Sequence, residues 1–328
     1  MKRSILIIGE ESFLAQNLKL HFLKIGREAI CVRSDFISRE KKANELISSL
    51  LKDKDLIITP GVESISDAWS KPHETLKSQF LESLNILCIL RDLNFKNRVI
   101  FIGSGEEYGR TENVSSKIKE EAPLDPLNIF GASKACQTLF AQLYHKSYGL
   151  DIIVARCFNE IGVGQADKFF VSNICKQLAF SEKRGLKETK ISVGNLLVKR
   201  CFIDVRDISK AVELLLEKGR SGEIYNIGSD APIQLSDLLD LISKKTNKKI
   251  NCEAEIIKFR LLDPPVLMPS TKKLKEHTGW KQDYPLEVTI EEIYNYWLKY
   301  FENEKKNYCG LITIFIQKLN RLYSWKKF

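Results

Sequence analysis

Two short stretches of the chain carry side chains that could transfer protons. Residues 103–109 (G-S-G-E-E-Y-G) offer a hydroxyl group and two carboxylates directly after an apolar run at 99–102. Further along, Phe130 and Lys134 are four residues apart, so they share one face of a helix expected at about 131–148. A hydroxyl, a carboxylate and an ammonium group suit hydrogen bonding and acid–base chemistry. We therefore expect a polar site where the strand at 99–102 ends.

A third stretch could hold the phosphates of a dinucleotide. The apolar run 4–8 ends at Gly9 and leads into a helical pattern, and a glycine loop between strand and helix is a common pyrophosphate site. Ser12, however, adds a side chain where the backbone would approach a phosphate, and Glu10 and Glu11 add two negative charges. The residues alone leave two interpretations open, a working dinucleotide loop and a structural turn.

These stretches lie in a regular alternation of apolar runs and helical patterns. Strands are expected over 4–8, 29–32, 56–59, 99–102, 151–155 and 223–227. Helices are expected from the glycine loop to 25 and over about 40–52, 75–93, 131–148, 169–181, 207–217, 235–245, 271–277 and 287–301. This alternation predicts an α/β fold of Rossmann type, a doubly wound parallel sheet with right-handed crossovers.

Two domains and a tail are expected along the chain. Residues 1–155 should form mainly a dinucleotide-binding domain, and residues 156–302 mainly a smaller C-terminal substrate domain whose elements partly return to the sheet. Residues 303–328 form a basic, amphipathic tail. Because apolar positions within 309–328 follow helical spacing and basic residues fill the remaining face, this segment is typical of a helix at a membrane surface. Packing on the body or on a sister subunit is the alternative.

Composition and charge limit the class of protein. The 328 residues are 44% hydrophobic and 28% charged, which fits a folded globular chain. Eight cysteines without a C-x-x-C pair, and a start without a signal-peptide pattern, predict a cytoplasmic protein. Four scattered histidines predict no metal site. Of the net charge of +9, residues 305–328 contribute six positive charges, so we expect no nucleic-acid partner.

Ordered motifs spread from about residue 3 to about residue 300 give the chain a family resemblance. They include G-S-G-E-E-Y-G at 103–109, P-x-x-x-F-G-A-S-K at 126–134, R-C-F-N-E-I-G-V-G-Q at 156–165, V-G-N-L at 193–196 and F-I-D-V-R-D at 202–207. The chain resembles the extended short-chain dehydrogenase/reductase family of nucleotide-sugar enzymes. Within it, the GDP-4-keto-6-deoxymannose reductases and GDP-mannose 4,6-dehydratases are the most similar. The resemblance implies NADP or NAD as cofactor, a nucleotide-diphosphate sugar as substrate and a homodimer.

The resemblance also assigns catalytic roles. Ser104 matches the family's hydroxyl group and Lys134 its lysine, but Phe130 stands in the position of the catalytic tyrosine. Phenylalanine cannot transfer a proton. Glu106 falls where the dehydratases carry a working carboxylate. A solvated loop carboxylate is the alternative role for Glu106.

On the cofactor side, the resemblance implies contacts from Gly9, Ser12, Phe13, Leu14, Arg33 and Lys134. Arg33, at the end of the second strand, could favour the 2′-phosphate of NADP. The chain also departs from the family here. Ser12 and Ala15 replace two loop glycines, and the stretch before Leu56 is about ten residues shorter than usual, which removes room for a strand at the adenine.

On the substrate side, the resemblance implies contacts from Asn159, Lys176, Arg200, Arg260 and Asp263. A guanidinium group pairs in bidentate fashion with phosphate, so two arginines suit a diphosphate. Surface arginines in ion pairs are the alternative.

Two functions stay open. The first is a nucleotide-sugar oxidoreductase or dehydratase of the GDP-deoxyhexose type, acting in surface polysaccharide synthesis. The second is a catalytically lapsed homologue that binds a nucleotide sugar or an active paralogue.

Overall fold

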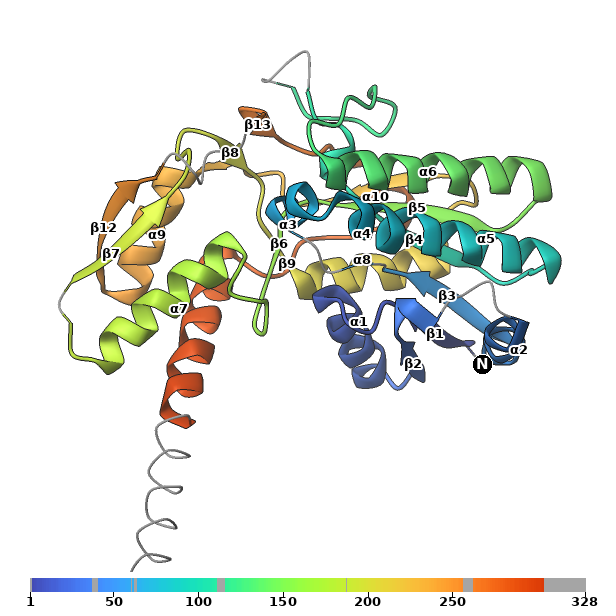
Figure 1. Ribbon diagram of the computed structural model, residues 1–328, viewed down its shortest axis with the longest axis horizontal. Coiled ribbons are helices and arrows are strands. Elements are labelled where there is room, and N and C mark those ends of the chain that lie inside the picture. Colours follow the sequence, from blue (N-terminus) through green and yellow to red (C-terminus); the bar gives the residue numbers. More distant parts are fainter. Residues whose placement is uncertain are drawn as a thin grey trace, which may run out of the picture.

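The computed structural model describes residues 2–36, 41–59, 61, 64–110, 116–186, 188–255 and 262–303. Within these residues, one central sheet contains the strands β1 (Ser4–Ile8), β2 (Ala29–Val32), β3 (Lys54–Ile58), β4 (Val99–Ser104), β5 (Ile152–Cys157) and β10 (Ile224–Ile227). All neighbouring strands are parallel, in the order β10-β5-β4-β3-β1-β2 (Figure 1). The predicted doubly wound parallel sheet is confirmed.

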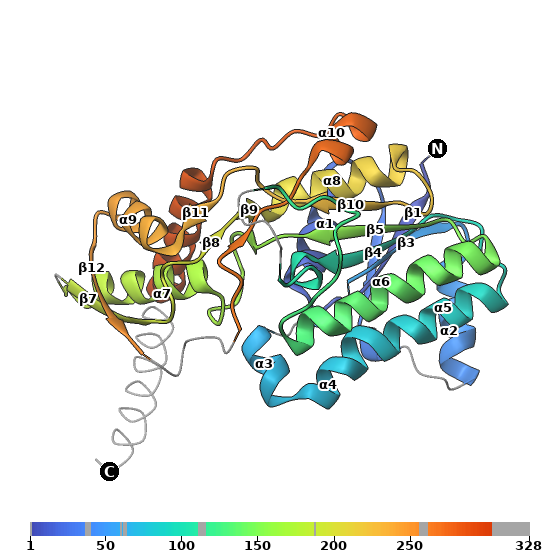
Figure 2. The same cartoon turned by 90° about the horizontal axis from the view of Figure 1, so that it is seen from above.

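Helices cover both faces of the sheet (Figure 2). One face packs against α1 (Phe13–Lys24), α8 (Val205–Lys218) and α10 (Lys272–Thr278). The other face packs against α2 (Lys41–Leu51), α5 (Glu82–Asp92) and α6 (Ile129–Tyr148). Along β1, Ile5 and Ile7 join the first core, whereas Leu6 and Ile8 join the second. Because both sides of the strand are buried, its sequence is a continuous apolar run.

The helix α6 matters most for the site, because it carries Phe130 and Lys134. Asn128 begins it, since the Oδ1 atom of this side chain accepts a hydrogen bond from the backbone N–H of Gly131 at 2.8 Å. Gly149 ends it in the left-handed conformation, with φ of +66°.

The C-terminal part of the chain lies beside the sheet (Figures 1 and 2). Here α7 (Phe170–Lys183), α9 (Leu235–Thr246) and a helix over 286–303 enclose a third hydrophobic core. A parallel pair, β7 (Glu188–Val193) and β12 (Lys249–Ala254), covers it on one side. The remaining strands are short: β6 (Glu160–Ile161), β8 (Lys199–Arg200), β9 (Ile203–Asp204), β11 (Ile233–Gln234) and β13 (Val266–Leu267).

The structure corrects three details of the expected elements. The single helix expected over 75–93 consists of α4 (Pro72–Leu76), a π-helical turn η2 (Lys77–Leu81) and α5. The sequence analysis missed α3 (Ile65–Ser70), although Ser64 and Asp67 form a capping box at its start. It also missed β12, whose only strand partner among the described residues is β7.

One edge of the sheet is formed by β2. After β2 the chain makes a short 3₁₀ helix, η1 (Ser34–Phe36), and then runs through α2 to β3, which pairs directly with β1. Within the described residues no strand lies beyond β2, as the short spacing before Leu56 predicts. The division at residue 155 stays a prediction, because β10 from beyond it belongs to the sheet and α8 packs against the sheet.

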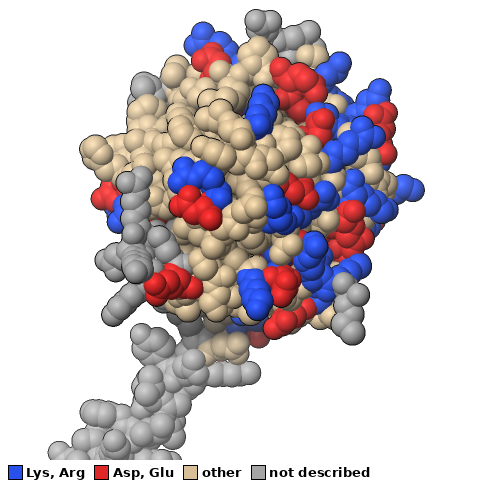
Figure 3. Space-filling model, turned by 90° about the vertical axis from the view of Figure 1, so that its right-hand side faces the viewer, with Lys and Arg blue, Asp and Glu red and all other residues tan. Residues whose placement is uncertain are grey.

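The surface carries both signs of charge. On the face shown in Figure 3, Lys and Arg are interspersed with Asp and Glu, and a broad area has few charged groups. This mixture gives no support for a nucleic-acid surface on that face. No helix in the described part of the chain is long and apolar enough to span a membrane. The predicted membrane contact through 309–328 lies outside the described residues.

Candidate active site

The centre of the site is the edge where β4 and β5 end. In the parallel pairing of these strands, Ser104 lies opposite Cys157. Ser104 also caps the short 3₁₀ helix η3 (Gly105–Glu107): its Oγ atom accepts a hydrogen bond from the Glu106 N–H at 3.2 Å. The hydroxyl group is half-buried at the carboxyl end of the sheet, where open α/β sheets bind ligands.

A buried ion pair fixes the loop behind Ser104. Glu107 is fully buried, and one of its oxygens accepts the Ser104 N–H at 2.8 Å. Its other oxygen accepts the Nε–H of Arg156 at 2.8 Å, and the Arg156 guanidinium lies 4.6 Å from the Tyr108 ring centroid. Two buried opposite charges need this close geometry to offset their desolvation. Glu107 and Arg156 therefore position the site, a role that the sequence analysis did not assign.

Glu106 and the start of α6 are held together. The Asn128 amide donates a hydrogen bond to the Glu106 carboxylate at 2.9 Å while its oxygen caps the helix. A side chain on Gly131 would clash with the Glu106 carbonyl, since its Cβ would lie 2.3 Å from that oxygen. The loop after β4 and the first turn of α6 are therefore in direct contact.

Lys134 points from α6 towards β4. Only 4% of this residue is exposed, and its Nζ atom donates a hydrogen bond to the Ile102 carbonyl at 3.0 Å. The same Nζ atom lies 6.0 Å from the centroid of the Phe130 ring. The structure thus brings Ser104, Glu106, Phe130 and Lys134 to one place, as the motifs predict.

Glu160 is a further acid in this place, and the sequence analysis assigned it no role. It follows β5 after Asn159, whose φ of +29° marks a sharp turn. Burial raises the pKa of the Glu160 carboxyl to about 7, although the Lys134 charge nearby lowers it. A carboxyl that titrates near neutral pH is suited to proton transfer. Its position next to Asn159 was the available signal, but only the folded chain shows the burial.

The glycine loop is a tight turn whose shape has local causes. Gly9 has φ of +110°, and a Cβ atom there would lie 2.1 Å from the Thr59 carbonyl oxygen. Ser12 caps α1, because its Oγ atom accepts the Ala15 N–H at 3.0 Å and shares a hydrogen bond with the Thr59 hydroxyl at 2.6 Å. The side chain of Leu14 is buried in the core, and that of Phe13 packs against the same core.

Arg33 lies just past the end of β2. Its guanidinium group forms a fork on the Asp35 carboxylate, with N–O distances between 2.8 and 3.3 Å. Both side chains are more than half exposed. The ion pair raises the pKa of Arg33 and lowers that of Asp35.

Two of the predicted substrate-side residues, Arg200 and Asp263, meet in an ion pair. The Arg200 guanidinium also donates hydrogen bonds to the carbonyls of Pro264 at 2.9 Å and Lys199 at 2.8 Å. Only 4% of Arg200 is exposed. Asn159 approaches the Cys201 carbonyl, at 3.5 Å from its amide nitrogen. Arg260 lies outside the described residues.

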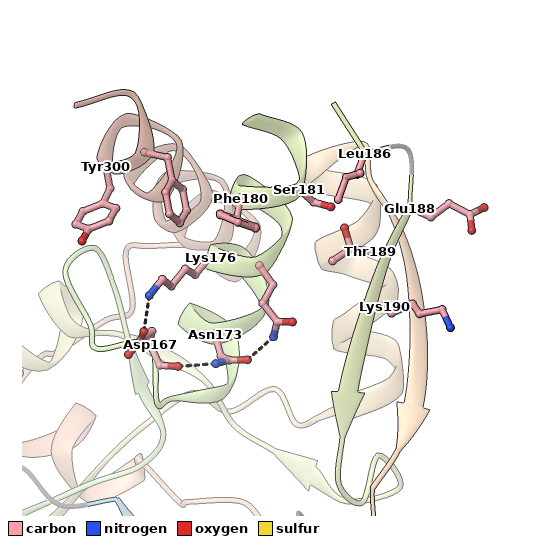
Figure 4. A pocket seen from close by; sticks show the side chains of 12 residues that line it. Asp167, Asn173, Lys176, Phe180, Ser181, Leu186, Glu188, Thr189, Lys190 and Tyr300 are labelled. Carbon is pink, nitrogen blue, oxygen red and sulfur yellow. Dashed lines mark hydrogen bonds and ion pairs between the residues drawn. The ribbon is translucent and has the colours of Figure 1, made fainter. Parts of the chain in front are cut away.

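Lys176 lies in a different place from the other predicted site residues. It lines a cavity of about 630 Å³ between α7, β7 and the helix over 286–303 (Figure 4). Its Nζ atom is 2.6 Å from the Asp167 carboxylate and 5.1 Å from the Trp297 ring centroid. Among the described residues, the lining contains no other residue predicted for the site. Contact of Lys176 with a nucleotide therefore stays a prediction.

The described residues contain no group of three or more His, Cys, Asp or Glu side chains that could hold a metal ion. The site therefore consists of a hydroxyl, two carboxyls and an ammonium group at the ends of β4 and β5. Beside it, at the end of β1, a helix N-terminus could receive a phosphate. This set of groups can bind an anion and transfer a proton.

Comparisons in sequence point to enzymes of nucleotide-sugar metabolism. GDP-6-deoxy-D-mannose reductase of Pseudomonas aeruginosa is 28% identical over 237 residues, which cover 72% of this chain and 78% of the reductase. A low-salt glycan biosynthesis protein of Haloferax volcanii is 26% identical over 274 residues, 80% of this chain and 82% of that protein.

Solved structures show the same fold. RMD from Pseudomonas aeruginosa, described as complexed with NADPH, superposes with a TM-score of 0.80 at 24% identity, over 90% of this chain and 99% of that chain. UDP-glucose 4-epimerase from Thermotoga maritima, solved with UDP-glucose, gives a TM-score of 0.79 at 22% identity, over 91% and 99% of the two chains.

The family model described as GDP-mannose 4,6 dehydratase matches residues 57–293. These residues include every element of the site at the ends of β4 and β5, whereas the glycine loop lies before them. The resemblance drawn from the motifs is thereby confirmed. The chain belongs to the GDP-mannose 4,6 dehydratase family, within the extended short-chain dehydrogenases/reductases.

Proposed function

We propose that this protein is a NAD(P)-dependent nucleotide-sugar oxidoreductase or dehydratase that acts on a GDP-linked deoxyhexose in surface polysaccharide synthesis in the cytoplasm. The observation that carries the proposal is the convergence of Ser104, Glu106, Lys134 and Glu160 at the ends of β4 and β5. Family membership and the similarity to a GDP-6-deoxy-D-mannose reductase support the substrate class.

The dinucleotide would lie between the glycine loop and Lys134. The turn at Gly9 and the first backbone N–H groups of α1 would face the pyrophosphate, while Ser12 already satisfies the Ala15 N–H. Phe13 and Leu14 would contribute backbone rather than side chains, because both side chains pack towards the core. When bound, the cofactor supplies or accepts the hydride.

Proton transfer would fall to a carboxyl group. Phe130 has no titratable proton, so Ser104 would hydrogen-bond the reacting sugar oxygen, and Glu106 or Glu160 would exchange the proton. Asn128 orients the Glu106 carboxylate through its 2.9 Å hydrogen bond. Lys134 would keep a positive charge beside the reacting atoms, since its Nζ atom is held by the Ile102 carbonyl.

The diphosphate would bind near Asn159 and Arg200. Because Arg200 is buried and already bonded to Asp263 and to two carbonyls, we assign it to shaping the wall of the substrate site. Arg260 would then make the main charged contact with the diphosphate. Lys176 would contribute only if the nucleotide reaches the cavity beside α7.

A second chain is expected as a partner. Large apolar side chains on α6 and on the π-helical turn before α5 remain exposed, with exposed fractions of 57% for Leu139, 52% for Leu143 and 48% for Leu81. We propose that these helices form a homodimer contact. Light scattering of the wild type and a Leu139→Asp, Leu143→Asp variant would measure it.

The second candidate is a lapsed homologue that binds a nucleotide sugar, or an active paralogue, without turning a substrate over. Phe130 in the tyrosine position favours it, as does a loop in which Ser12 fills space normally left to glycine. This candidate keeps the substrate site but needs no hydride transfer.

Calorimetry separates the two candidates from a protein without a nucleotide-sugar site. Wild type should bind GDP-mannose more tightly than UDP-glucose or dTDP-glucose, and Arg260→Ala should weaken all three by roughly 10- to 150-fold, the value of a charge-assisted contact. Arg220→Ala, at an exposed arginine outside the predicted site, is the matched control. Absence of binding of all three sugars would reject the first candidate and would leave, of the second, only the homologue that binds an active paralogue. Sugar binding without binding of NADH or NADPH at millimolar concentration would select the lapsed homologue.

A further inference from the structure

A polar wall lies where β2 ends and faces the glycine loop. Ser34, directly past β2, is buried, and both its hydroxyl and its N–H donate to the Glu11 carboxylate, the N–H at 3.4 Å. Glu82, the first residue of α5, interacts with the same serine. Burial raises the pKa of the Glu82 carboxyl, the contact with the Ser34 side chain lowers it, and the Glu11 charge raises it again. We call Glu11, Ser34 and Glu82 the ribose wall.

The ribose wall has an acceptor that no described residue of the protein uses. Glu82 is only 8% exposed, yet its Oε2 atom has no hydrogen-bond partner among the described residues. One helical turn earlier, Gln79 is 1% exposed, and its Oε1 atom also lacks a partner there. The Gln79 side chain borders the turn after β3, because a Cβ atom on Gly61 in that turn would lie 1.9 Å from the Gln79 amide nitrogen. Buried acceptors without donors are costly, so these two suit a ligand that donates hydrogen bonds.

The charges around the ribose wall are mainly negative. Glu11, Glu82, Asp35 and Glu10 interact with one another or with Arg33 at this edge. Among the described residues, two cations oppose them. Lys77 acts on Asp35 and Glu82 from the turn before α5, and Arg33 is already bonded in a fork to Asp35. A phosphate arriving here would meet buried carboxylates and would compete with Asp35 for Arg33.

In doubly wound sheets, the end of the second strand is where the adenosine ribose of a dinucleotide lies. A ribose diol donates hydrogen bonds, whereas a 2′-phosphate only accepts them at neutral pH and brings between one and a half and two negative charges. Carboxylate acceptors match the diol and repel the phosphate.

We propose that Glu11 and Glu82 bind the ribose hydroxyls of the adenosine and exclude a 2′-phosphate, so that this protein uses NAD(H) in preference to NADP(H). The proposal rests on the proposed function, since it requires a bound dinucleotide. It reverses the preference that Arg33 alone suggests from the sequence. It also separates this chain from RMD of Pseudomonas aeruginosa, whose solved structure is described with NADPH.

Fluorescence titration of the full chain with NADH and with NADPH tests the proposal. Calorimetry with ADP-ribose and with 2′-phospho-ADP-ribose repeats the comparison without any contribution of the nicotinamide. At low salt, wild type should bind the ligand without the 2′-phosphate at least about tenfold more tightly than the ligand with it. This ratio of the two affinities should fall at high salt. Glu11→Gln and Glu82→Gln should each reduce the ratio by about threefold or more.

Glu10→Gln is the matched control, because it removes the same charge from the adjacent loop residue without removing a bond to Ser34. The Glu10 carbonyl, not its side chain, accepts the hydrogen bond from Gln16. Because Glu10 adds only charge to this edge, its ratio should fall less than that of Glu11→Gln. If Glu82→Gln fails to fold, Glu11→Gln, on the half-buried loop, still tests the wall.

Equal binding of NADH and NADPH by the wild type overturns the proposal and leaves the oxidoreductase function standing. A preference that neither Glu11→Gln nor Glu82→Gln reduces also overturns it. If no dinucleotide binds at millimolar concentration, the ribose wall and the oxidoreductase function fail together, while binding of GDP-mannose in the same preparation would still support the lapsed homologue.

Discussion

The Glu160 carboxyl should make the stability of this protein depend on pH across the neutral range. Burial raises its pKa from 4.5 to about 7 in the folded chain, and Lys134 limits the rise. The folded state therefore binds the proton more tightly than the unfolded state. Its favourable contribution is complete below about pH 4.5 and is lost as the pH rises through 7.

The expected size follows from this difference in pKa. One unit corresponds to about 1.4 kcal/mol, so ionised Glu160 should cost the folded state up to about 3 kcal/mol above pH 7. Because the side chain is half-buried, solvent screens part of this charge, and the figure is an upper value. Glu160→Gln keeps the shape and cannot ionise. It should match the wild type near pH 5 and be more stable by about 1–3 kcal/mol at pH 8.5.

Urea unfolding followed by tryptophan fluorescence, at pH 5 and at pH 8.5, measures this difference. Glu106→Gln is the control, because it changes the other carboxyl of the site, which accepts a hydrogen bond from Asn128. It should not gain stability at pH 8.5. The reasoning is refuted if Glu160→Gln changes stability equally at both pH values, or if it is less stable than the wild type at pH 8.5.

Three further substitutions test the site. Phe130→Tyr restores a phenol on a ring whose centroid lies about 6 Å from the Lys134 amine. It should raise turnover of a GDP-4-keto-6-deoxyhexose by 10²–10⁴-fold, followed by absorbance of the reduced cofactor. No gain, with both ligands bound, would place the fault elsewhere. Gly9→Ala forces a Cβ atom to 2.1 Å from the Thr59 carbonyl oxygen. It should lower the free energy of unfolding by about 1–3 kcal/mol, measured by thermal unfolding, and abolish dinucleotide binding, measured by titration. An unchanged melting temperature would contradict this prediction. Asn128→Ala removes the cap of α6 and should cost about 1 kcal/mol in urea unfolding, whereas Asn128→Ser should cost less.

Much of the fold could be predicted because its signals are local. The apolar runs 4–8 and 99–102 are continuous, since helices bury both faces of the sheet, and strands of this kind are recognised by that continuity. The turn η2 within the expected helix over 75–93 could not be predicted, because a π-helical turn depends on what the helix packs against. For β12 the reason is similar, because its residues are largely exposed and their pairing with β7 is long-range.

The site divides in the same way. The motifs predict that Ser104, Glu106 and Lys134 lie near one end of the sheet, because strand ends and helix faces follow from the element order. The structure places them there, and their roles stay a prediction. The pairing of Arg200 with a carboxylate and two carbonyls arises from strands distant in sequence, and the spacing of residues does not encode it. The shifted pKa of Glu160 depends on burial, which only the assembled chain determines.

The path of the chain through the sheet has a consequence for folding during synthesis. The helix α1 packs against α8, and β5 obtains its outer neighbour β10 only when the chain has reached residue 227. Contacts between such distant segments slow folding, because a long loop must close before they form. A ribosome-bound chain that ends at residue 155 would expose the apolar faces of α1 and β5 to water and to other nascent chains. The first half of the chain should therefore aggregate when it is expressed alone, and chaperone binding should be strongest before β10 emerges.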